Sequence, residues 1–198
     1  FPSLLKTYPG LRIDLDGEMK QSKITARSIG QALLMGAIAI YLLLSLQFRS
    51  YVEPVIVMVA VPLAFIGVIW GHLLMGLELS MPSMMGFVSL VGIVVNDSIL
   101  LVEFVKHRAR EGMSVHDAAS QASQDRFRAI FLTSLTTVVG LLPLLLETSL
   151  QAQILIPLVT SIVFGITVST LLILFVLPAL YGILEDFGFT ETGRDEEG

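Results

Sequence analysis

Five long segments of the chain are almost free of charged residues, and this feature limits the possible folds most strongly. A helix needs about 20 apolar residues to cross the hydrocarbon core of a bilayer. Charged residues make up only 15% of the sequence, against about 25% in ordinary soluble domains. The sequence therefore predicts an all-α membrane protein with five transmembrane helices, at about 29–48, 54–77, 80–105, 129–146 and 154–181.

The first 28 residues have a different pattern. Tyr8, Pro9 and Gly10 form a turn signal, and residues 11–16 alternate between apolar and charged side chains, which is the period of a β-strand. We expect residues 1–28 to be the end of a water-exposed domain, with a short strand leading into the first membrane helix. Because one strand cannot be stable alone, we expect the chain to be a piece of a longer polypeptide.

Lysine and arginine residues predict the orientation, because short cytoplasmic loops carry an excess of them. The segment between the third and fourth predicted spans is rich in these residues, whereas residues 76–82 and 147–153 contain none. The basic residues of that segment are Lys106, Arg108, Arg110, Arg126 and Arg128. We expect this segment and the acidic tail at 185–198 to be cytoplasmic, and the amino-terminal end to be periplasmic.

A capping pattern lies inside the same basic segment. Ser114 is followed three residues later by Asp117, as in a capping box, and small apolar residues then recur at helical spacing. The pattern predicts a loop helix at 112–125. It fits a helix along the membrane surface and a helix packed against neighbouring protein about equally well.

Small residues recur at helical spacing in two of the predicted spans. Lipid provides no hydrophobic drive for helix association, so such stripes mark faces where backbones approach closely. The predicted packing residues are Gly67, Gly71, Ser161, Gly165 and Ser169.

Asp97 is the main candidate for chemistry. It lies within the third predicted span, where an ionised carboxylate costs roughly 2.5–3.5 kcal/mol and must face a partner or water. A carboxyl group at this depth can carry a proton, or it can connect helices through hydrogen bonds. Asn96 fits an interhelical hydrogen bond and a polar pathway equally well, and Thr133 offers a hydroxyl at membrane depth. For His72 a buried structural role is favoured.

Other classes of function lack support in the sequence. There is no cysteine, no His/carboxylate cluster with metal-ligand spacing and no glycine-rich phosphate loop. No basic patch has the density that nucleic acids require. We therefore predict no metal, no catalytic residue, no cofactor and no enzymatic activity.

Several motifs together resemble the permeases of the RND (resistance–nodulation–division) efflux transporters. Residues 92–104, GIVVNDSILLVEF, resemble their tenth transmembrane helix, and residues 126–135 followed by 140–144 resemble their eleventh. Residues 48–54 and 61–63 resemble the passage from helix eight to helix nine, and the start of the chain resembles the end of the periplasmic porter domain. The resemblance extends in order to about Tyr181.

The resemblance implies helices 8–12 of a homotrimeric, proton-driven pump in the bacterial inner membrane, with a periplasmic adaptor and an outer-membrane channel as partners. It also implies a coupling site, in which two acids on the fourth helix exchange protons with a lysine on the tenth. The family's arginine and threonine positions match Arg126 and Thr133. The lysine position falls on Asn96, and no lysine occurs between Lys23 and Lys106. We therefore expect Asp97 to take part in coupling, facing the fourth-helix acids.

The expected function is efflux of amphiphilic small molecules or drugs, as in multidrug resistance. Three alternatives remain open at this point. The chain could be a non-transporting scaffold or remnant, a sodium-coupled pump, or a lipid- or protein-export relative.

Overall fold

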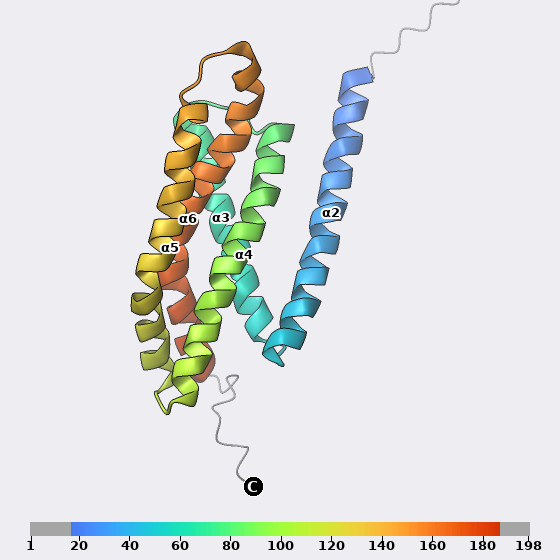
Figure 1. The fold of residues 1–198 in the computed structure, drawn as a ribbon. Helices are drawn as coiled ribbons and strands as arrows, with labels where there is room; N and C mark the ends of the chain where they lie inside the picture. Colours follow the sequence, from blue (N-terminus) through green and yellow to red (C-terminus); the bar gives the residue numbers. More distant parts are fainter. Residues whose placement is uncertain (1–16, 187–198) are drawn as a thin grey trace, which may run out of the picture.

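The computed structural model describes residues 17–186, which form five α-helices (Figure 1). They are α2 (Gly17–Phe48), α3 (Glu53–Met75), α4 (Met81–Arg110), α5 (Val115–Leu145) and α6 (Leu150–Asp186). All five are long and apolar enough to cross a membrane. The predicted count of five membrane helices is therefore confirmed. The predicted strand at residues 11–16 lies outside the described residues.

Four helices are longer than the predicted spans: α4 continues to Arg110, α6 extends from Leu150 to Asp186, and α2 and α5 differ most. α2 begins at Gly17, so residues 17–28 continue the first predicted span as helix. α5 joins the expected loop helix at 112–125 and the expected span at 129–146 in one helix of 31 residues. Ser114 caps its start by accepting a hydrogen bond from the Asp117 amide (3.1 Å). No glycine or proline occurs from residue 115 to residue 139, so nothing in the sequence interrupts the helix.

The helices α3 to α6 form a four-helix body in which α6 packs against the other three. Glycines allow the closest approaches, because a side chain there would collide with the neighbouring helix. A Cβ atom at Gly67 would lie 2.6 Å from the carbonyl oxygen of Phe164 on α6. Gly71 lies directly against the ring of the same Phe164, and Gly165 lies against Leu90 of α4. These glycines hold α3 and α4 close to the middle of α6.

Hydroxyl groups add hydrogen bonds within the body. The Ser161 hydroxyl on α6 donates to the carbonyl of Ser83 on α4, at 2.9 Å. The Ser169 hydroxyl, also on α6, is buried and donates to the carbonyl of Ile166 in its own helix. Ser134 of α5 and Thr170 of α6 share a buried hydrogen bond of 2.6 Å.

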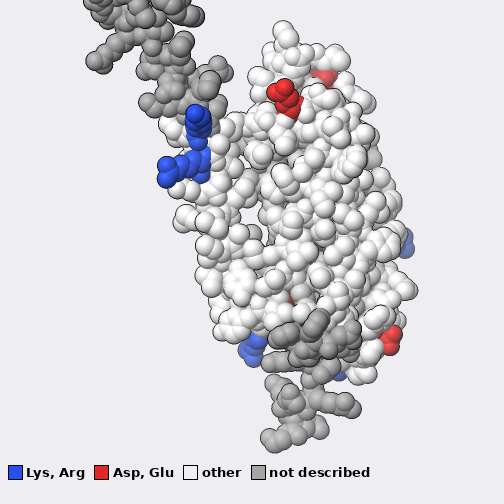
Figure 2. Space-filling model, turned by 180° about the vertical axis from the view of Figure 1, so that it is seen from behind, with Lys and Arg blue, Asp and Glu red and all other residues white. Residues whose placement is uncertain are grey.

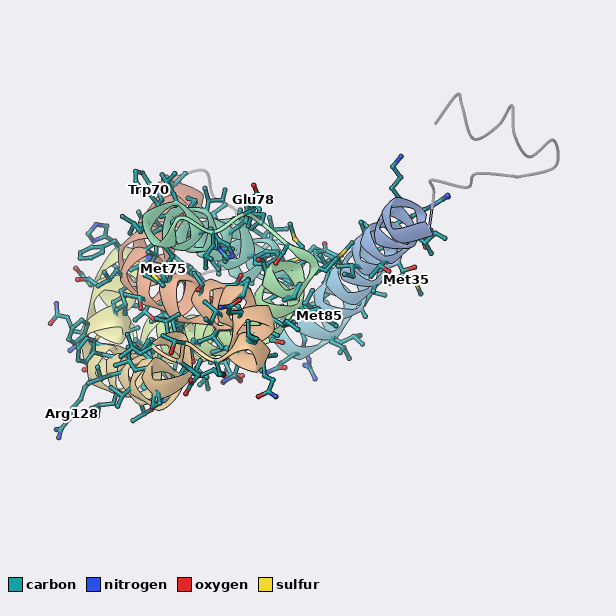
Figure 3. The ribbon with its side chains drawn as sticks, turned by 90° about the horizontal axis from the view of Figure 1, so that it is seen from above. Met35, Trp70, Met75, Glu78, Met85 and Arg128 are labelled. Atoms are coloured by element: carbon teal, nitrogen blue, oxygen red, sulfur yellow. The ribbon has the colours of Figure 1, made fainter. Side chains whose placement is uncertain are left out.

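The helix α2 stands apart from this body and meets it at one end only (Figures 1 and 3). Only 6% of the residues in its apolar part are buried, compared with 44% in α3 and 50% in α4. The contacts that exist lie near its carboxyl end, where Leu44 and Phe48 are buried and Gln47 donates to Glu103 at 2.7 Å. Between residues 24 and 43, α2 exposes apolar side chains, among them Ile24, Leu34, Met35 and Leu42.

Lys106 of α4 makes contacts with the end of α2 and the start of α3. Its ammonium group donates to the Glu53 carboxylate of α3 at 2.8 Å and to the Phe48 carbonyl of α2 at 2.9 Å. It also lies 5.5 Å from the centre of the Phe48 ring. The next residue, Arg49, has a positive φ of 54°, so the chain leaves α2 through a left-handed turn. Lys106 therefore adds a charged contact to the hydrogen bond of Gln47 and the buried Leu44 and Phe48 at this end of α2.

Candidate membrane-embedded ionisable site

The helix α4 presents different residues to its two sides. Asp97 is buried, with 9% of its surface exposed, whereas the neighbouring Asn96 is exposed. Successive residues of an α-helix are turned by about 100°, so two neighbours cannot face the same partner. Although Asn96 and Asp97 are neighbours in the sequence, Asp97 therefore lies in the interior of the chain and Asn96 lies on its outer surface.

The face of α4 that carries Asp97 packs against α5. Phe104 and Arg108 lie seven and eleven residues after Asp97, which returns to nearly the same side of a helix. The Arg126 guanidinium of α5 lies over the Phe104 ring, 4.0 Å from its centre. One turn beyond, Arg108 makes an ion pair of 2.7 Å with Asp125 of α5.

The Arg126 side chain reaches this face of α4 at Phe104, about two helical turns from Asp97. No direct ion pair joins Asp97 and Arg126 among the ion pairs of the described residues. The Nε atom of Arg126 is buried and has no hydrogen-bond partner in the described part of the chain. Asp97 and Arg126 thus belong to the same α4–α5 contact and form no direct ion pair in the described part of the chain.

The two remaining candidate residues lie on the exposed surface. The Thr133 hydroxyl donates to the carbonyl of Ala129 in its own helix, at 2.6 Å, and its side chain is otherwise exposed. Asn96 is exposed on α4, on the same outer side as Gly92. Of the four residues expected to take part in coupling, Asp97 and Arg126 lie at the α4–α5 contact, whereas Asn96 and Thr133 lie on the exposed surface.

A second buried polar group lies at the other end of the body. His72 of α3 is 2% exposed, in agreement with the expected buried role. In its neutral form the ring donates from Nδ1 to the Val68 carbonyl (2.9 Å) and accepts at Nε2 from the Ser83 hydroxyl (2.7 Å). Ser83 also belongs to the capping box that Ser80 begins at the start of α4. Sequence reasoning missed Ser83, although the Ser80-to-Ser83 spacing is a capping signal.

Charged side chains gather towards the two ends of the molecule and are scarce along its middle (Figure 2). Arg128 points away from the helices (Figure 3). In the described part of the chain, no group of three His, Asp or Glu side chains lies close enough together to hold a metal ion.

Five membrane-length helices with a buried carboxyl in α4 fit a multi-pass membrane protein. Residues 3–185 match the family model described as the AcrB/AcrD/AcrF family. The chain therefore belongs to this family of RND efflux permeases.

Two solved structures also resemble the chain. Both are crystal forms of a heavy metal efflux pump, with TM-scores of 0.72 and sequence identities of 28% and 27%. The matches cover 84% and 85% of this chain but only 16% and 17% of those pumps. The chain thus spans about one sixth of the length of the structures that it matches.

Proposed function

We propose that the chain forms transmembrane helices 8–12 of a proton-driven RND pump that expels amphiphilic small molecules across the bacterial inner membrane. The pump is a homotrimer that works with a periplasmic adaptor and an outer-membrane channel. Membership of the family and the five membrane-length helices support this proposal. In this reading residues 1–28 end the porter domain and residues 185–198 form a cytoplasmic tail.

The burial of Asp97 on the face of α4 that packs against α5, with Arg126 at the same interface, is the observation that carries the proposal. Opposite charges attract much more strongly in a low-dielectric interior than in water. An ionised Asp97 therefore attracts Arg126 and draws α4 towards α5, whereas a protonated Asp97 does not. Binding and release of a proton at this carboxyl change the force between two helices, which is what a proton-driven conformational cycle requires.

Asn96 and Thr133 have a different role in the proposal. Both are exposed in this chain, so they are available to the other membrane helices of the pump. The acids of the fourth helix would meet this outer face, while Asp97 acts from inside through α5. This modifies the expectation that Asp97 itself faces those acids.

The orientation follows from the distribution of charge. The end of the body that holds Arg49, Lys106 and Arg110 faces the cytoplasm, because basic residues are retained on that side. The opposite end carries the loops at 76–80 and 146–149, which contain Glu78 and Glu147 but neither lysine nor arginine.

The test is transport by the full-length pump in proteoliposomes with an imposed pH gradient. Asp97→Asn should reduce efflux of a cationic amphiphilic dye to background, because the amide cannot exchange a proton. Asp97→Glu should retain part of the activity, and Glu78→Gln, which removes an exposed carboxyl in the loop at 76–80, is the matched control. Normal pH-driven efflux by folded Asp97→Asn would rule out the proposed role of the carboxyl.

The same vesicles separate the alternatives. Transport that follows a sodium gradient at constant pH would identify a sodium-coupled pump, and no transport by the wild type would favour a scaffold. The relatives named as heavy metal efflux pumps make metal ions the second substrate class to assay. Metal-ion efflux without dye efflux would contradict the proposed substrate class.

A further inference from the structure

His72, Ser83 and Ser80 form a row of hydrogen-bonding groups at the end of the body opposite Lys106. His72 lies in the last turn of α3, Ser80 is the residue before α4, and Ser83 lies in the first turn of α4. His72 and Ser83 are buried, whereas Ser80 is partly exposed. The row therefore leads from the surface of the α3–α4 hairpin to a buried imidazole, and none of its residues belongs to the α4–α5 contact of Asp97.

The directions of the hydrogen bonds in this row follow from the groups at its inner end. The Val68 carbonyl can only accept, so the His72 ring carries a hydrogen on Nδ1 and donates it at 2.9 Å. In the neutral ring Nε2 is therefore the acceptor, and the Ser83 hydroxyl donates to it at 2.7 Å. Because the one hydrogen of Ser83 is used there, its oxygen accepts from the Ser80 amide and from the Ser80 hydroxyl, both at 3.1 Å. Both hydroxyl hydrogens thus point towards the imidazole.

The same atomic positions also satisfy a charged imidazolium. Its Nδ1–H still donates to the Val68 carbonyl, and its Nε2–H donates to the Ser83 oxygen. The Ser83 hydroxyl then turns and donates to the Ser80 oxygen, and the Ser80 hydrogen turns outwards. Neither charge state of the ring leaves a member of the row without its hydrogen bonds, so the ring can gain a proton without any movement of the helices.

The elements packed around the ring bring no charged side chain to it. The helix α3 has no charged residue after Glu53, α4 has none before Asp97, and α6 has none over residues 150–184. Two carboxylates lie in the loops at this end, Glu78 and Glu147, and both are exposed. Glu147 accepts hydrogen bonds from amides of its own loop. The imidazole is therefore the group in this region that can change its charge, and no carboxylate holds it in one state.

The ring lies where three helices meet. The Ser83 carbonyl accepts from the Ser161 hydroxyl of α6 at 2.9 Å, which joins α4 to α6 beside the row. Gly71, the residue before His72, lies directly against the Phe164 ring of α6. A proton on the imidazole therefore places a positive charge at the junction of α3, α4 and α6.

We propose that His72 is a proton-binding site separate from Asp97, loaded through Ser80 and Ser83 from the side of the 76–80 loop. A hydronium ion outside gives its proton to the Ser80 oxygen, Ser80 passes its hydroxyl hydrogen to Ser83, and Ser83 passes its own to Nε2. Each hydroxyl ends with one hydrogen, a water molecule remains outside, and the ring gains one positive charge. The assignment of this entrance to the periplasmic side rests on the orientation proposed above, whereas proton binding itself does not depend on transport.

The test is nitrogen-15 NMR of the histidine-labelled full-length pump in lipid vesicles, over the range of about pH 5 to 8 in which imidazoles ordinarily change charge. The His72 signals are identified by their loss in His72→Gln. The wild type should show a neutral ring with its hydrogen on Nδ1 at the upper end of the range and an imidazolium at the lower end.

Two variants of Ser80 separate proton transfer from helix capping. Asparagine caps a helix as well as serine does, but its amide does not pass a proton along. Ser80→Asn should therefore slow the exchange between the neutral and charged rings about tenfold, the factor that an added barrier of ~1.4 kcal/mol gives. Ser80→Thr keeps both a hydroxyl and a cap and is the matched control, with exchange at the rate of the wild type.

Three results would overturn the proposal. A ring that stays neutral over the whole range binds no proton, and a neutral ring with its hydrogen on Nε2 contradicts the assigned bond directions. Equal exchange rates in Ser80→Asn and Ser80→Thr would exclude the path through Ser80. If His72 fails to titrate in a pump whose transport depends on Asp97, the proposed function stands and this site does not. If Asp97→Asn leaves both pH-driven transport and the His72 titration unchanged, the proposed role of Asp97 fails and this site stands.

Discussion

The helix α2 and the four-helix body differ in how much of their apolar surface is buried within the chain. Both consist of helices that are apolar enough to cross a membrane, yet α2 buries little of its surface and the body buries much more. The body contains glycines at its helix contacts, whereas a Cβ atom at Gly30 or Gly36 of α2 would meet nothing within 4 Å. Apolar character thus places a helix in the membrane, and close backbone approach holds it against a neighbour.

The largest effect that this comparison predicts is at Gly67. Gly67→Leu should destabilise the full-length pump by about 3 kcal/mol, because the new side chain must displace the backbone of α6. The measurement is unfolding in mixed detergent micelles, followed by circular dichroism. Gly36→Leu in α2 is the control and should be nearly neutral. Similar losses at both glycines would contradict the distinction between the two regions.

Lys106 should give the next largest effect. Lys106→Met removes the bonds to Glu53 and to the Phe48 carbonyl and should cost about 2 kcal/mol, the range for a hydrogen bond to a charged group. Spin labels at the exposed positions Met35 of α2 and Met85 of α4 should report a broader distance distribution, because α2 loses these bonds to the body. Arg110→Met, which removes an exposed charge of the same helix, is the control. An unchanged distribution would show that other contacts fix α2.

The smallest effect is expected at Ser161. Ser161→Ala removes the hydrogen bond to the Ser83 carbonyl and should cost about 0.6 kcal/mol, the average for such bonds between membrane helices. Ser89→Ala is the matched control, since that hydroxyl bonds only within α4. Unfolding in mixed micelles again provides the measurement. A loss above about 2 kcal/mol would mean that the hydroxyl supports more than this bond.

The sequence predicts the helices well because their signals are local. Long uncharged segments predict five helices, and Ser114 predicts the start of α5. The continuation of α5 through residues 126–129 was missed, because the basic residues there looked like the end of a loop. Charge marks the boundary of the membrane, whereas a helix ends only where its backbone bonds end.

The site is less predictable because it depends on which helices are neighbours. Sequence reasoning selects Asp97 and Asn96 as polar residues at membrane depth. It cannot tell which of them points inwards, since that depends on where α5 packs. The contact between Arg126 and Phe104 joins residues of two helices and has no local signal. The bond between His72 and Ser83 likewise requires the packing of α3 against α4.

The position of α6 has a consequence for how the protein is made. This helix leaves the ribosome after α3, α4 and α5, yet it supplies Phe164, Ser161 and Thr170 to the contacts that hold these three helices together. During synthesis the faces of α3, α4 and α5 that contact α6 therefore stay exposed in the membrane until α6 is inserted. Quality-control proteases would cleave the chain most readily before α6 is inserted. A stop codon before Leu150 would leave α3, α4 and α5 permanently in this susceptible state.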